Sequence, residues 1–156
     1  SRGAFIGLGT DTDHTVLYRS MLEGMTFDVK MIVDGISQFM EVPEIEKIHC
    51  FGGESRNHLL MKIKASVLNR TLTKMEMPET VSLGAALLGG IGADIFTNLQ
   101  EALNGLKFNI NEILPQSEWV EPYQKIYDDV FSGAWKQIRP LQEQLLEVFP
   151  SEDSDS

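Results

Sequence analysis

The chain has 156 residues, of which 42% are hydrophobic and 23% are charged, a balance typical of a folded globular protein. Its formal net charge is −10 and its 13 lysines and arginines are scattered, so a nucleic-acid-binding protein is not expected. A single cysteine, Cys50, excludes an internal disulfide, and no apolar run is long enough to span a membrane. We therefore expect a cytoplasmic protein that binds neither nucleic acid nor membrane.

The first elements expected are a short strand and a long helix. Residues 4–8 are apolar with Gly7 inside, which predicts a strand that another strand approaches closely. The chain enters this segment almost at once, which suggests a portion of a longer protein. Asp13 can cap the helix that follows, because residues 17–39 repeat apolar side chains every three or four positions. Close packing against a neighbour would be one reason to tolerate Gly24 inside that helix.

The middle of the chain alternates strands with helices. Residues 45–51 are mostly apolar and stop at two glycines, which predicts a buried strand. Residues 59–68 carry the apolar face of a second helix, and residues 71–75 predict another strand. A third helix is expected to begin near Thr80. This order predicts an α/β sheet with crossover helices.

The C-terminal part is expected to be mainly helical. Residues 97–116 are less regular and predict a connector over the surface. Apolar positions between 123 and 149 mark a long terminal helix, which Pro140 should bend or split. Residues 150–156 form an acidic polar tail that we expect to be disordered.

The segment with the most chemical information is residues 51–57, FGGESRN, which follows a predicted strand and opens a predicted helix. Open α/β sheets bind ligands at such positions. Gly52 and Gly53 lack side chains that would keep a ligand from the backbone, and the amides at a helix start suit a phosphate or ribose oxygen. Asn57 can present a donor and an acceptor to a base edge. A tight strand-to-helix turn capped by Asn57 explains the same residues equally well.

This segment resembles a loop of a known family. Residues 52–57 are similar to the adenosine-binding loop in the C-terminal domain of the FGGY carbohydrate kinases, which include glycerol kinase, xylulokinase and gluconokinase. In the same order, residues 2–8 resemble the strand before this region, residues 17–24 the long-helix signature, and residues 79–86 the final Gly-Ala-Ala helix. The likeness covers roughly residues 2–93, and the terminal helix suits the xylulokinase-like branch.

The resemblance implies a fold and a set of binding residues. The fold is α/β, a partial lobe of the ribonuclease-H-like, actin-like ATPase type with a long C-terminal helix. Residues 1–149 would form the nucleotide-side lobe, incomplete at its N-terminus. The cofactor-binding positions are Gly52, Gly53, Glu54 and Asn57, with the second glycine near the phosphates and the asparagine near adenosine. Glu54 stands where many members have a small residue, so its carboxylate would repel phosphate unless it turns outward.

The implied function is ATP-dependent phosphorylation of a sugar or polyol, with ATP and Mg²⁺ held mainly by the full-length enzyme. The family's catalytic aspartate and sugar contacts lie upstream of the matched region. No catalytic residue is therefore assigned here, and this chain alone is expected to be inactive. Xylulose, gluconate and glycerol all stay open as substrates. His14, His49 and His58 lack the spacing to share a metal ion, so no metal site is predicted on this chain.

Two other interpretations stay open. One is a non-catalytic, actin-like binding module that uses the same loop for structure. The other is self-association, for example as a homodimer, through apolar surface and a strand edge that a further lobe would cover. Gly84, Ala85, Ala86 and Gly89 make one helix smooth, which allows close helix packing either within the domain or at an interdomain hinge. Arg19 and Glu23 lie four residues apart, which predicts a surface ion pair and no catalytic role.

Overall fold

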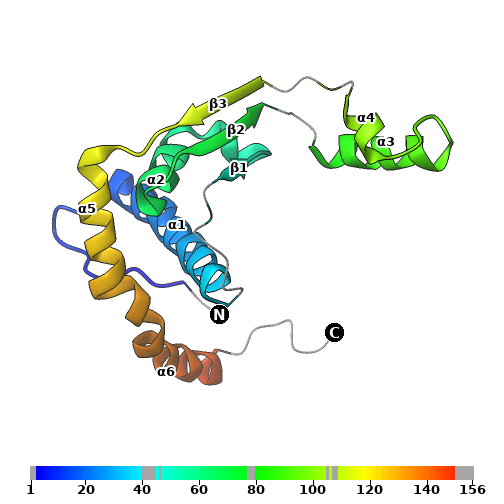
Figure 1. Cartoon of the computed structure of the whole chain (residues 1–156). Coiled ribbons are helices and arrows are strands. Elements are labelled where there is room, and N and C mark those ends of the chain that lie inside the picture. Colours follow the sequence, from blue (N-terminus) through cyan, green and yellow to red (C-terminus); the bar gives the residue numbers. More distant parts are fainter. Residues whose placement is uncertain are drawn as a thin grey trace.

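A computed structural model describes residues 3–39, 45, 47–76, 80–104, 106 and 109–149. In chain order the elements are α1 (His14–Phe39), β1 (Ile48–Cys50), the 3₁₀ turn η1 (Gly53–Arg56), α2 (His58–Leu68), β2 (Leu72–Glu76), α3 (Thr80–Gly92), α4 (Leu99–Asn104), β3 (Asn109–Ile113), α5 (Ser117–Ile126), the π-helical turn η2 (Tyr127–Phe131) and α6 (Ser132–Val148). The described strands form a sheet in the order β1-β2-β3 (Figure 1). β1 and β2 run parallel, as the predicted crossover helix requires, whereas β2 and β3 run antiparallel.

Helix α2 lies at the centre of the core, because two of its faces are buried. One face packs against α1 and α5, and the other packs against the sheet. Ile63 belongs to the first face and Met61 to the second, and both are almost fully buried. The helix is therefore apolar around most of its circumference, as expected for a helix with neighbours on two sides. Asn57 caps its start, and Asn69 ends it in the left-handed conformation.

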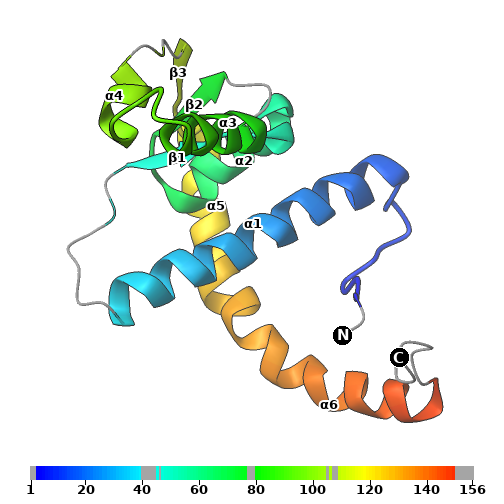
Figure 2. The same ribbon diagram turned by 90° about the vertical axis from the view of Figure 1, so that its right-hand side faces the viewer.

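The terminal helices form one bent rod that crosses α1 (Figure 2). An aromatic cluster joins the rod to α1, with Phe27 in ring contact with Tyr123, Tyr127 and Phe131. The long terminal helix is confirmed, but it begins at α5 and is not split at Pro140, which lies inside α6. The irregular turn is η2 instead, upstream of the proline.

Several expectations about local structure are wrong. Residues 4–8 form no strand, and Phe5, Ile6 and Leu8 are exposed, because no strand pairs with this segment within the described part of the chain. Gly24 makes no close contact, since a side chain there would meet only open space. Residues 97–116 are not an irregular connector, because they contain α4 and β3.

Helices α3 and α4 pack against each other and project away from the strands (Figure 1). The tight contact here is at Gly90, where an added Cβ would lie 2.8 Å from the Phe96 ring. At Gly84 and Gly89 an added Cβ would meet nothing within 4 Å. The close packing predicted for residues 84–89 is therefore not seen among the described residues. The predicted tail, residues 150–156, lies outside them.

Candidate nucleotide-binding loop

The predicted loop leaves the carboxyl end of β1 and turns directly into η1. Gly52 has φ of +85°, a conformation that side-chain-bearing residues rarely adopt, so glycine suits this position. Beneath the turn, buried Ser55 donates to the Gly52 carbonyl oxygen twice, from its N–H at 3.2 Å and its hydroxyl at 2.8 Å. Gly53 faces outward, and an added Cβ there would meet no atom within 4 Å. The turn is thus closed on its inner side and open on its outer side.

Asn57 joins this turn to α2 and is also tied to α1. Its Oδ1 accepts from the Leu60 N–H at 3.1 Å, which is the predicted helix cap. Its Nδ2 donates to the Tyr18 hydroxyl at 3.1 Å. The side chain is half-buried, and one N–H of its amide is not used by either contact. Capping and ligand binding are therefore compatible at Asn57.

The Glu54 carboxylate is held by a lysine of α2. Lys64 Nζ lies 2.6 Å from Glu54 Oε2, forming an ion pair that joins η1 to α2. The Lys64 side chain is largely buried, whereas that of Glu54 is mostly exposed. The ammonium group offsets the negative charge that the Glu54 carboxylate places at this loop. The contact could not be predicted from the sequence, since no local pattern pairs these two residues.

A small hollow lies on the inner side of the loop, between the sheet and helices α1 and α2. It measures about 250 Å³, and its walls include Val29, Cys50, Met61 and Leu72. Burial raises the pKa of the Cys50 thiol, and this effect outweighs the opposing influence of the Lys64 ammonium. A neutral thiol in an apolar wall fits a packing role for Cys50 better than a reactive one.

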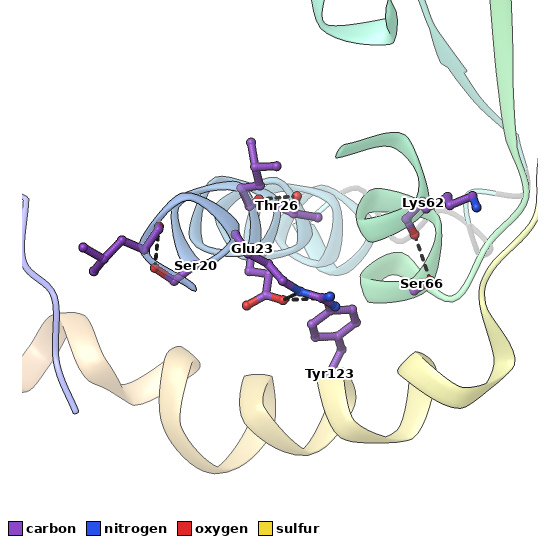
Figure 3. Close-up of polar contacts among 9 residues, drawn as sticks. Ser20, Glu23, Thr26, Lys62, Ser66 and Tyr123 are labelled. Atoms are coloured by element: carbon purple, nitrogen blue, oxygen red, sulfur yellow. Dashed lines mark hydrogen bonds and ion pairs between the residues drawn. The ribbon is translucent and has the colours of Figure 1, made fainter. Parts of the chain in front are cut away.

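A polar cluster links α1 to α5 (Figure 3). The Tyr123 hydroxyl donates to Glu23 Oε1 at 2.7 Å and accepts from Arg19 Nη2 at 3.0 Å. Arg19 also pairs with Glu23 at 2.8 Å and lies over the Trp119 ring, 4.7 Å from its centroid. The predicted ion pair is confirmed, but it is partly buried and shared with a tyrosine.

Metal and membrane features can be judged only within the described ranges. There, no three His, Cys, Asp or Glu side chains lie close enough together to hold a metal ion. None of the helices described has the length and apolar character needed to cross a membrane.

The family follows from comparison with known proteins. The family model described as "FGGY family of carbohydrate kinases, C-terminal domain" matches residues 1–93, so the chain belongs to this family. It is 30% identical over 142 residues to ribulokinase 2 of Staphylococcus saprophyticus, covering 90% of this chain and 25% of the relative. The chain thus spans about a quarter of the length of that kinase.

Solved structures agree with this fold. The chain is similar to xylulose kinase from Rhodospirillum rubrum, with a TM-score of 0.70, 23% identity, and coverage of 90% of this chain and 28% of that one. It is also similar to Plasmodium falciparum glycerol kinase with ADP, with a TM-score of 0.61, 22% identity, and coverage of 81% and 25%. The described part of this chain is mostly helical with a small three-stranded sheet. A non-catalytic binding module is not favoured by these comparisons.

Proposed function

We propose that this chain is the adenine-nucleotide-binding part of an ATP-dependent carbohydrate kinase, which phosphorylates a sugar or polyol hydroxyl. One observation carries the proposal. The glycine turn after β1 is supported from inside by Ser55 yet open on its outer side at Gly53, directly before the N-terminus of α2. Backbone can approach phosphate oxygens closely at such a turn, and the helix dipole favours the negative charge.

Each proposed binding residue then has a distinct task. Gly52 sets the direction of the turn, and Gly53 leaves room for the phosphates. Glu54 keeps its carboxylate engaged with Lys64 and so tolerates a nearby anion. Asn57 offers its remaining amide N–H to an acceptor on the adenosine.

The remaining parts of the reaction are assigned to the rest of the enzyme. Phosphoryl transfer needs a group that positions the sugar hydroxyl, and Mg²⁺ that neutralises charge on the β- and γ-phosphates. No residue of this chain is assigned to either role, so the chain alone is proposed to bind without turnover. The sugar contacts are likewise proposed to come from outside this chain.

The test uses the full-length gene product that carries this chain. ATP and ADP should raise its unfolding temperature, because a ligand bound to the folded state stabilises it. ATP-dependent phosphorylation is then assayed on ribulose first, since the cited relative is named a ribulokinase, followed by xylulose, gluconate and glycerol. No thermal shift at millimolar nucleotide, together with no turnover on any of these compounds, would refute the proposal.

A further inference from the structure

The orientation of the Asn57 amide is defined by two partners from different parts of the chain. The Leu60 N–H needs an acceptor, so the atom facing it is Oδ1 and the other amide atom is Nδ2. Nδ2 then donates to the hydroxyl of Tyr18, a residue 39 positions earlier in the sequence. The cap alone constrains one end of the amide, and the tyrosine constrains the other.

Tyr18 is itself well placed to hold a side chain still. It lies in the first turns of α1, where the Asp13 carboxylate accepts from the Thr15 and Val16 N–H groups at 2.8 and 2.9 Å. Tyr18 is about half exposed, and its hydrogen bond with Asn57 lies at the surface, where a ligand could reach Asn57.

We propose that Tyr18 is a positioning residue for the adenine nucleotide. By accepting one N–H of Asn57, its hydroxyl directs the remaining N–H toward the adenosine. This inference rests on the proposed nucleotide-binding role of the loop. It assigns to α1 a part in nucleotide affinity, although Tyr18 lies in the long-helix segment, outside the predicted binding loop. Preorganising a polar group in this way lowers the cost of ordering it when ligand binds.

A double-mutant cycle tests the contact in the full-length enzyme. Tyr18→Phe removes the acceptor and keeps the ring, so the KM for ATP should rise roughly two- to tenfold, the range for one hydrogen bond. The sugar KM and kcat should stay unchanged. Asn57→Ser keeps an oxygen to cap α2 but removes Nδ2. In the Asn57→Ser background, Tyr18→Phe should therefore have no further effect on the KM for ATP.

Two further measurements separate positioning from a general loss of structure. Tyr123→Phe removes the hydroxyl that bonds Arg19 and Glu23 of α1, and this hydroxyl makes no contact with Asn57. The variant should therefore lower stability and leave the KM for ATP unchanged. In nuclear magnetic resonance of the wild-type protein, the Asn57 side-chain amide protons should exchange with water more slowly than in Tyr18→Phe. This readout needs no nucleotide.

The possible failures can be distinguished. If the wild-type enzyme binds no ATP, both the proposed function and this inference fall. If the wild-type enzyme binds ATP and Tyr18→Phe binds it equally well, the inference alone is refuted. The same holds if Tyr18→Phe weakens binding to the same extent in the Asn57→Ser background, because the tyrosine would then act without Asn57.

Discussion

Removing the Tyr123 hydroxyl should destabilise the fold by loosening α5 from α1. In Tyr123→Phe the ring keeps its contacts in the aromatic cluster, and only the hydroxyl between Arg19 and Glu23 is lost. Hydrogen bonds to charged groups contribute about 1.5–3 kcal/mol each. The side chains of Arg19 and Glu23 remain 43% and 23% exposed, so water can replace part of what is lost. We therefore expect a net loss of about 1.5 kcal/mol, below the sum of two such bonds.

Urea denaturation, monitored by tryptophan fluorescence, measures this loss as a lower urea concentration at the unfolding midpoint. The slope of the unfolding free energy against urea concentration should not change. Arg139→Ala is the matched control, because it breaks the Arg139–Glu143 pair at 2.8 Å, in which both side chains are mostly exposed. That variant should lose less than about 0.5 kcal/mol. Equal stability of Tyr123→Phe and wild type would show that the cluster does not hold the helices together.

Three other predictions follow from the described contacts. Burial raises the pKa of both Tyr123 and Tyr127 to about 12, above the ordinary 10.0. A raised folded-state pKa means that the fold favours the neutral phenol, so stability from these groups is complete below about pH 10 and is lost as pH rises through about 12. Urea midpoints across this window should fall, and a flat profile would contradict it. Lys64→Met should free Glu54 and weaken ATP binding, measured by calorimetry, whereas unchanged affinity would show that the ion pair does not matter for nucleotide. Light scattering of this chain should show self-association that Ile32→Glu reduces, because Ile32 is an exposed apolar residue of α1; a monomeric wild type would reject this.

Most of the helices and two strands could be predicted from the sequence, because their evidence is local. The apolar repeat over residues 17–39 matches α1, and residues 71–75 match β2 within one position. β3 was not predicted because its sequence, NINEI, contains asparagine and glutamate, which are uncommon in strands. Residues 4–8 show the opposite error. They are apolar enough for a strand, but a strand also needs a partner, and the described residues offer none.

The candidate loop was predicted from its two glycines and its place after a strand, and the structure shows both features. Its supporting contacts could not be predicted in the same way. The Tyr18–Asn57 and Lys64–Glu54 contacts depend on how α1, η1 and α2 pack together. No spacing along the sequence carries that information. The residue types of a loop can thus be used to predict part of its chemistry, whereas the contacts that orient its side chains depend on tertiary structure.

The proposed nucleotide-binding turn is tested most directly by adding a side chain to it. Calorimetric titration of ATP is compared between the full-length wild-type enzyme and its Gly53→Leu variant, with Gly35→Leu as the control. A Cβ at either glycine would meet nothing within 4 Å, so a side chain can begin at either position without a contact at its first atom. We predict that Gly53→Leu loses at least about tenfold in ATP affinity, or about 1.4 kcal/mol, while Gly35→Leu binds as the wild type does. Equal ATP affinity in all three proteins would contradict a phosphate site at this turn.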